Sequence, residues 1–268
     1  MKTLTISKPI GSITHITGTI GAGKTTFIGD MLYNEQQKGK CAYLYTKREG
    51  NEHSGSWSVL PPDVLDPASN TECILLETLK DIEDLFKKWR STPLQALGID
   101  TSMGVELLIR TFITGGPDKE LQSSLKDPQH KRFKNKLCDI IQDFRDVAKY
   151  TIMVSPATPT AYNPETAMYD KGASGSPIDA EKRFSPDGEN QDSKLKLLYL
   201  SDYAFHIQMD EGHGTGLIKK RTLMMQPSLK YMTKARLPIG KQIENIILEP
   251  KVGVNWLKLK AQIEGTFA

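Results

Sequence analysis

The feature that most constrains the fold is a glycine-rich stretch close to the start of the chain. Residues 18–25 read GTIGAGKT and fit the pattern G-x-x-x-x-G-K-[ST]. The alternating, β-branched segment Ile13 to Thr17 before it predicts a short strand. Apolar residues at helical spacing follow it, namely Phe27, Ile28, Met31 and Leu32. The sequence therefore predicts a strand, a tight turn and a helix in direct succession.

The residue types in this turn suit the binding of phosphate. Glycines allow the backbone to point its N–H groups at phosphate oxygens, and the start of the following helix adds a favourable dipole. Lys24 is expected to neutralise the β and γ phosphates of a nucleotide, and Thr25 to place its hydroxyl on Mg²⁺. The alternative is a glycine turn that caps a helix and carries an incidental lysine. The candidate nucleotide-binding residues are Gly18, Thr19, Ile20, Gly21, Ala22, Gly23, Lys24, Thr25 and Thr26.

Strand-like and helix-like segments alternate along the next part of the chain. Strands are expected at residues 41–46, 72–76, 94–100 and 150–155, and helices at residues 81–89 and 130–149. This order predicts an α/β fold with a mostly parallel sheet flanked by helices, and ligands at the carboxyl ends of the strands. Residues 196–208 and 222–226 predict an antiparallel extension. We expect a core over residues 1–240 with a long mobile loop at 157–194, and a C-terminal extension, 241–268, packed on it.

An acidic residue stands at the end of one of these strands. The segment LQALGID is strongly apolar and ends in Asp100, where a phosphate-binding site with Mg²⁺ needs a second ligand for the metal. Asp100 is therefore a candidate catalytic and metal-binding residue, and the hydroxyls of Thr101 and Ser102 are expected to support it. The alternative is that Asp100 caps the helix that begins near Met103.

Composition limits the cellular setting. The net charge of +3 does not identify a partner, but residues 126–136 and 217–241 are strongly basic, whereas residues 160–193 are rich in acids, Gly, Ser and Pro. Basic runs can neutralise nucleic-acid phosphates or be solvated faces. The chain has three cysteines without a CxxC pair, so we expect buried, reduced thiols. No segment suits secretion or a membrane span, and we expect a cytoplasmic protein.

The order of these segments resembles the RecA-like ATPase core, and most closely the small phage nucleotide-binding proteins that act as single-strand-annealing recombinases. The resemblance extends from about residue 10 to residue 240, and the glycine turn is its one specific motif. It implies a Mg²⁺-dependent ATPase that binds single-stranded DNA, self-associates with ATP at subunit interfaces, and works in the host cytoplasm. A single-strand-binding protein is a further partner that it suggests.

The resemblance also assigns roles to individual residues. The family has a glutamate at the end of the second strand that activates water; Lys47 falls at that place here, and Glu49 or Glu52 follows. The family has an Asn, Gln or His that senses the γ phosphate at the end of the strand that matches YTIMVSP, whereas this chain has Ser155 and Pro156 there. Ser155 or Thr158 would have to take that part. Lys234 and Arg236 match a cation pair that in the family reaches the nucleotide of a neighbouring subunit. The alternative for these two residues is an exposed basic edge strand.

The same resemblance bears on DNA binding. The acidic loop at 160–193 lies where RecA-like proteins carry a DNA-binding loop, so DNA binding is expected to depend more on the basic runs, including Lys131 and Arg132.

Other kinds of nucleotide-binding protein are alternatives. A GTPase would carry N-K-x-D, whereas NKLCD at residues 135–139 has one residue too many. A small-molecule kinase would want an arginine-rich lid, and residues 101–125 contain only Arg110. A viral packaging or helicase-loading ATPase would share the cation supplied by a neighbour, and this alternative stays open.

Overall fold

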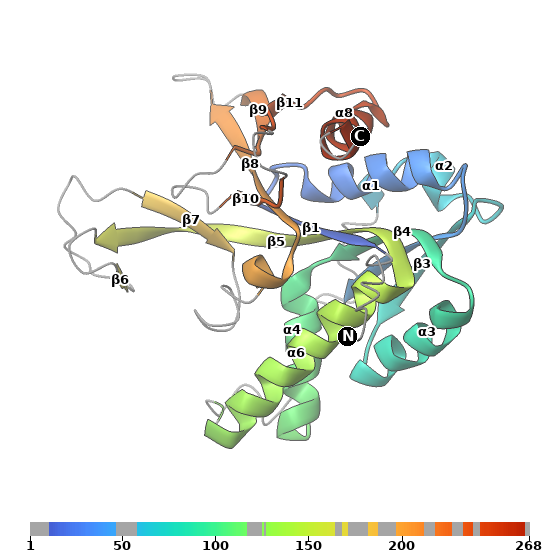
Figure 1. Ribbon diagram of the computed structural model, residues 1–268, viewed down its shortest axis with the longest axis vertical. Coiled ribbons are helices and arrows are strands. Elements are labelled where there is room, and N and C mark those ends of the chain that lie inside the picture. The colour runs from blue at the N-terminus through green and yellow to red at the C-terminus, as the bar shows by residue number, and fades with distance from the viewer. Residues whose placement is uncertain are drawn as a thin grey trace, which may run out of the picture.

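The computed structural model describes residues 11–46, 58–116, 125, 127–163, 168–170, 182–186, 197–211, 218–226, 233–237 and 242–265. The described chain is an α/β structure with a mostly parallel sheet, helices on both faces and additional antiparallel strands (Figure 1). The predicted fold class is confirmed at this level.

The elements follow the chain in the predicted alternation. The strands of the first half are β1 (Ser12–Gly18), β2 (Cys41–Thr46), β3 (Thr71–Leu76), β4 (Leu94–Asp100) and β5 (Ala148–Asn163). The later strands are β6 (Met168–Asp170), β7 (Lys182–Pro186), β8 (Tyr203–Glu211), β9 (Ile218–Met224), β10 (Lys234–Ala235) and β11 (Ile246–Ile247). The helices are α1 (Lys24–Glu35), α2 (Pro62–Leu65), α3 (Leu79–Ser91), α4 (Ser102–Thr114), α6 (Asp127–Val147) and α8 (Val254–Gly265).

The strand order brings distant segments to one edge of the sheet. The order is β11-β9-β8-β1-β5-β4-β2-β3, and the strands from β8 to β3 run parallel. Strand β5 therefore lies between β1 and β4. Gly18 at the end of β1 aligns with Pro156, and Asp100 at the end of β4 aligns with Val154, so the glycine turn and Asp100 lie at the same edge.

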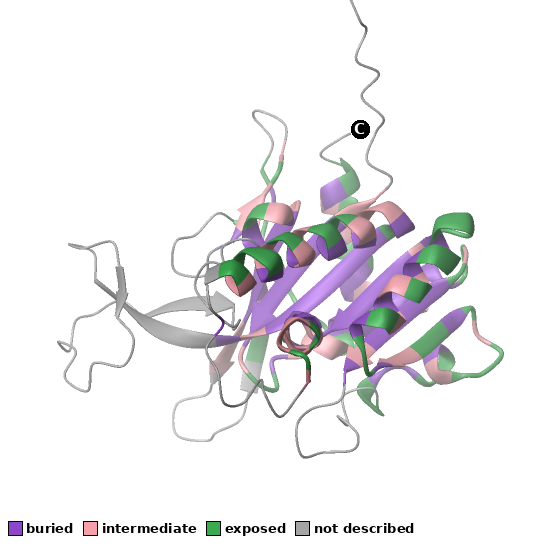
Figure 2. Cartoon of the chain, turned by 90° about the horizontal axis from the view of Figure 1, so that it is seen from below, coloured by how far each residue is buried: buried purple, intermediate pink, exposed green. Residues whose placement is uncertain are grey.

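Two apolar layers hold the helices on the sheet. Ile16 belongs to the layer under α1 and α8, whereas Ile13 belongs to the layer under α3, α4 and α6, because successive side chains of a strand point to opposite faces. Figure 2 shows the strands buried and the outer faces of the helices exposed. Gly98 of β4 allows α1 to approach the sheet closely, since a Cβ there would lie 2.2 Å from Cγ2 of Ile28.

The chain after residue 156 differs from the predicted irregular loop. Strand β5 continues to Asn163 and pairs antiparallel with β6 and β7, and Figure 1 shows this ribbon projecting from the main sheet. The prediction of a loop is therefore wrong for residues 157–163, 168–170 and 182–186. The rest of the predicted loop lies outside the described residues.

The C-terminal segment packs on α1. Strand β11 pairs antiparallel with β9, and α8 contacts α1 through two buried acids. Asp30 accepts hydrogen bonds from the backbone N–H of Gly253 and from Asn255, and Glu35 accepts one from Nε1 of Trp256 at 2.9 Å. These contacts place residues 242–265 in the same core as the glycine turn. None of the described helices is both long enough and apolar enough to span a membrane.

The three cysteines all lie in the described part of the chain and form no disulfide with one another, and they differ in burial. Cys41 is buried in β2, Cys138 is half-buried in α6, and Cys73 is exposed. The prediction of buried thiols is therefore wrong for Cys73. The reason is its position on β3, which ends the strand order of the sheet and is covered less than the central strands.

Candidate functional site

The glycine turn has the backbone conformation that its composition predicts. Gly21 and Gly23 have φ angles of 79° and 94°, in the left-handed region that strains any residue with a Cβ. Gly23 is also the N-cap residue of α1, and among the described residues no side chain caps that helix. The first N–H groups of α1 therefore lack the side-chain oxygen that usually satisfies them, which is the arrangement that suits an anion.

Lys24 folds back on the turn from the first position of α1. Its Nζ donates to the carbonyl oxygens of Gly18 and Thr19, both at 2.8 Å. These are neutral acceptors, and a hydrogen bond from an ammonium to a phosphate oxygen is roughly twice as strong. The lysine therefore stands where a bound phosphate would attract it.

Thr25 and Asp100 are in direct contact although 75 positions separate them in the sequence. The hydroxyl of Thr25 donates to Oδ2 of Asp100 at 2.7 Å, and the hydroxyl of Tyr43 donates to the same oxygen at 2.8 Å. Asp100 is 7% exposed, and Tyr43 is buried in β2. Two hydrogen bonds thus hold this carboxylate at the head of α1.

The cap of α4 is Thr101 and not Asp100. The side chain of Thr101 accepts a hydrogen bond from the backbone N–H of Gly104 at 3.3 Å, as an N-cap residue does. The alternative role considered for Asp100, as the cap of this helix, is therefore wrong. Its carboxylate turns toward α1 instead.

The pair of Thr25 and Asp100 fits a magnesium ion. Mg²⁺ is commonly bound by one or two protein oxygens, with phosphate oxygens and water completing the shell. The hydroxyl of Thr25 and the carboxylate oxygen of Asp100, which are in contact beside the glycine turn, are such a donor set. Among the described residues, no group of three or more His, Cys, Asp or Glu side chains could hold a metal by itself.

A buried polar row lies next to this pair. Nε2 of His15 and Oγ of Ser155 are 2.6 Å apart, and Ser155 also hydrogen-bonds the hydroxyl of Ser102. Burial lowers the pKa of His15 to about 4, so its ring is neutral near pH 7. Its Nδ1 has no hydrogen-bond partner among the described residues. The row joins β1, β5 and the start of α4 behind the turn.

A second histidine lies at the end of β8. Oγ1 of Thr17 and Nδ1 of His206 are 3.0 Å apart. Burial, and to a smaller degree the positive charge of Lys24, lowers the pKa of His206 to about 4. His15, His206 and Tyr43 were not predicted as site residues from the sequence. For the two histidines, a sequence signal was available, because each lies in a buried strand beside the glycine turn.

The basic pair that the resemblance singled out lies elsewhere. Strand β10 pairs with the amino-terminal part of β8, where Lys234 aligns with Ala204, whereas Gly18 aligns with Ile207, three residues further along that strand. Nζ of Lys234 donates to three carbonyl oxygens at 2.8–3.0 Å, those of Leu198, Tyr199 and Ser201. Lys234 is thus held within its own chain and is not the freely exposed cation of an edge strand.

Arg236 is held more loosely than Lys234. Its guanidinium contacts Oδ1 of Asp202 and the carbonyl oxygen of Tyr199, both at 3.2 Å, and its side chain is 51% exposed.

The other predicted residues are placed as follows. Glu49 and Glu52 lie outside the described residues, and Lys131 and Arg132 are exposed on α6. The side chain of Ile20, at the tip of the turn, is 86% exposed.

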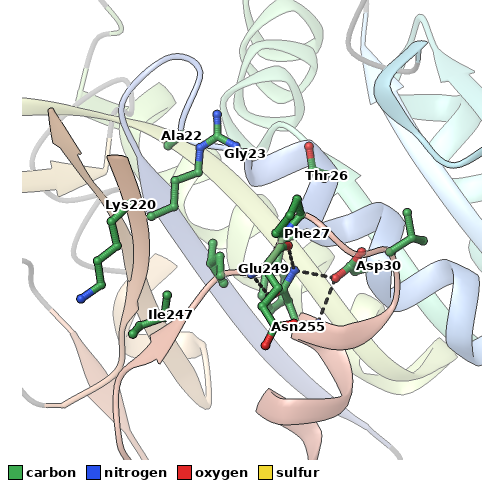
Figure 3. A pocket seen from close by; sticks show the side chains of 13 residues that line it. Ala22, Gly23, Thr26, Phe27, Asp30, Lys220, Ile247, Glu249 and Asn255 are labelled. Atoms are coloured by element: carbon green, nitrogen blue, oxygen red, sulfur yellow. Dashed lines mark hydrogen bonds between the residues drawn. The ribbon is translucent and has the colours of Figure 1, made fainter. Parts of the chain in front are cut away.

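A pocket of about 520 Å³ opens beside the turn. Figure 3 shows that its walls come from the start of α1, from β9 and from the segment that leads into α8. Thr26 lies on the α1 side of it, opposite Glu249 and Asn255. Its lining is Ala22, Gly23, Thr26, Phe27, Asp30, Lys220, Arg221, Ile247, Leu248, Glu249, Pro250, Val252 and Asn255.

Comparison with known proteins adds no family to this description. No family model matches the chain, and no curated protein matches its sequence.

Proposed function

We propose that the chain is a Mg²⁺-dependent ATPase with a RecA-like core built around a P-loop. The observation that carries the proposal is the contact between Thr25 and Asp100 at the head of α1, beside Lys24 and the uncapped glycine turn. A metal ligand on the turn and an acid at the end of another strand are the two halves of a phosphoryl-transfer site. A glycine turn that merely started a helix would not require a buried carboxylate on its threonine.

Each residue of the site then has a chemical role. The N–H groups of the turn bind phosphate oxygens, and Lys24 exchanges its carbonyl partners for the β and γ phosphates. Thr25 and Asp100 would hold Mg²⁺, and the ion would supply positive charge that stabilises the phosphates during hydrolysis. The attacking water is activated by Glu49 or Glu52, as the resemblance implies.

Strand β5 supports the RecA-like assignment over a small-molecule kinase. It lies between β1 and β4 and brings Ser155 beside the turn, where the resemblance expects a sensor of the γ phosphate. His15 and Ser102 hold the hydroxyl of Ser155 from two sides. We propose that Ser155 is this sensor and that His15 positions it.

The biological role that we propose follows from the resemblance. The protein binds single-stranded DNA and anneals or recombines it as phage-type proteins of this kind do, and it assembles with ATP between subunits. Lys131 and Arg132 are exposed and suit phosphate contacts. Arg236 suits the contact with a neighbour's nucleotide, because it is half exposed and its own partners are long contacts.

The test is phosphate release from ATP by the purified chain, without DNA and with single-stranded or double-stranded DNA. We expect hydrolysis that needs Mg²⁺ and that single-stranded DNA stimulates most. Asp100→Asn should lower turnover by about 100-fold with an unchanged melting temperature, because a metal ligand is lost. Asp143→Asn, at an acid of an exposed ion pair, is the matched control. Wild-type turnover in Asp100→Asn would overturn the proposal.

A further inference from the structure

The pocket beside the turn shares residues with the phosphate-binding turn. Ala22 and Gly23 belong to the turn, and the same two residues line the pocket. A ligand whose phosphates lie on the turn therefore has the pocket open to the rest of its molecule. Its volume of about 520 Å³ lies within the range typical of small-molecule sites.

The side chains of the pocket suit a flat, partly polar group. Phe27 and Leu248 supply apolar surface, while the hydroxyl of Thr26 and the carboxylate of Glu249 supply hydrogen-bonding groups. The far wall is anchored, because Asn255 donates from its side chain to Asp30 of α1 at 2.9 Å (Figure 3). The pocket is therefore formed before any ligand enters.

Arg221 connects the pocket to the turn. Its guanidinium contacts the carbonyl oxygen of Gly21 at 3.4 Å, and its side chain passes about 4 Å from where a Cβ of Gly23 would lie. Its side chain is exposed, and no carboxylate pairs with it in the part of the chain that the structure describes. The adjacent Lys220 points its ammonium away from Gly23 (Figure 3). Arg221 is thus a cation of the same chain that lies over the turn without a strong partner.

We infer that this pocket binds the base and ribose of the nucleotide, and that Arg221 contacts its phosphates from within the same subunit. The inference rests on the proposed function and adds to it a nucleoside site and a cation supplied in cis. It also reassigns part of the basic run 217–241, which the sequence analysis connected with DNA, to the nucleotide.

The experiment measures binding of ATP and of inorganic tripolyphosphate to the full chain by calorimetry, with Mg²⁺ present. Tripolyphosphate fills the turn alone, whereas ATP fills the turn and the pocket. Val252→Trp, at a lining residue that is 43% exposed, should weaken ATP binding at least about tenfold and leave tripolyphosphate binding unchanged. Arg221→Gln should weaken both ligands by about tenfold.

The matched controls carry substitutions of the same type at exposed positions outside the pocket. Leu257→Trp lies on α8 at a residue that is 50% exposed, and Arg90→Gln lies on α3. Both should bind the two ligands as the wild type does. Ile247→Trp, on another wall of the pocket, serves as the second variant if Val252→Trp melts early.

The outcomes separate the inference from the proposed function. Wild-type protein that binds neither ligand would end both. Tripolyphosphate and ATP bound equally well, or ATP affinity unchanged in both tryptophan variants, would overturn the nucleoside site and leave the phosphate site standing. Arg221→Gln with wild-type affinity for tripolyphosphate would overturn the cis cation.

Discussion

The two ends of α1 differ in how completely their polar groups are hydrogen-bonded. At its start, Lys24 donates to the neutral carbonyl oxygens of Gly18 and Thr19, and no described side chain caps the helix. Toward its end, Glu35 is fully buried and accepts hydrogen bonds from Trp256, Lys260, Gln95 and Lys38. One helix therefore carries an unsaturated polar site and a saturated one.

The difference shows which polar groups act in binding and which in stability. A buried charge costs free energy unless partners compensate it. A fully hydrogen-bonded cluster such as that of Glu35 therefore contributes to the stability of the fold. Polar groups left with weak or neutral partners at an accessible place are ready for a ligand. The comparison makes a double prediction: changes at the start of α1 should alter activity, and changes toward its end should alter stability.

The largest effect is expected from Lys24→Ala. It should reduce ATP hydrolysis by 1,000-fold or more and weaken binding of the triphosphate, because a charge-assisted contact to the phosphates is lost, an effect of roughly 4 kcal/mol. Phosphate release and calorimetry measure the two effects. Lys87→Ala, at an exposed lysine of α3, is the control. Turnover within about twofold of wild type would contradict the functional role of the start of α1.

The second prediction extends the comparison to the pair at β10, where Lys234 is saturated and Arg236 is not. Arg236→Ala should bind ATP nearly normally but hydrolyse it up to about 1,000-fold more slowly, if it acts on a neighbour's nucleotide. Lys234→Met should lower the melting temperature, because it leaves three carbonyl oxygens without their donor.

Mixing inactive variants tests the role of Arg236 directly. Lys24→Ala protein should lend its arginine to the intact turn of Arg236→Ala protein, and a random equal mixture should recover up to about a quarter of wild-type activity. Sedimentation confirms that the variants assemble together. Co-assembly without recovery at any ratio would leave Arg236 as a structural partner of Asp202.

The third prediction concerns the saturated end of α1. Glu35→Ala should lower the free energy of unfolding by about 3 kcal/mol or more, because Lys260 and Trp256 lose a buried partner. Urea titration measures the loss, and tripolyphosphate binding to the folded protein should stay within about threefold of wild type. Asp84→Ala, at an exposed ion pair, is the control. An equal loss of stability in both variants would contradict the structural role of Glu35.

The smallest effect is a dependence of stability on acid. Burial raises the pKa of Glu35, but hydrogen bonds from Lys260, Trp256, Gln95 and Lys38 outweigh it and lower the pKa to about 2. A lowered carboxyl pKa stabilises the folded state above the unfolded value of 4.5, and this contribution is lost as pH falls toward 2. It amounts to about 3 kcal/mol at most.

The measurement compares two proteins across this window. Wild type and Glu35→Gln should differ most in unfolding free energy above pH 5, and the difference should shrink as pH falls toward 2. Burial raises the pKa of Asp30, so its own contribution has the opposite sign and falls as pH rises. The difference between the two proteins cancels it. A constant difference over the whole range would show that Glu35 is not held as its contacts indicate.

Local sequence determined the start of α1 and the class of the fold. The turn, its lysine and its threonine follow from eight consecutive residues, because left-handed glycines and an open helix start are properties of neighbouring positions. The alternation of strands and helices followed from periodicity in the same way. Asp100 could be proposed as a partner of the turn because parallel strands end at a common edge.

Only the tertiary structure decided the partners that lie far apart along the chain. The row of His15, Ser155 and Ser102, the contact of Arg221 with the turn, and the docking of residues 253–260 on α1 join segments separated by 53 to 225 positions. Periodicity shows which face of a strand or helix is apolar, but not which residue of another element lies opposite a given side chain. Sheet order and register make that choice, and they depend on packing across the whole core.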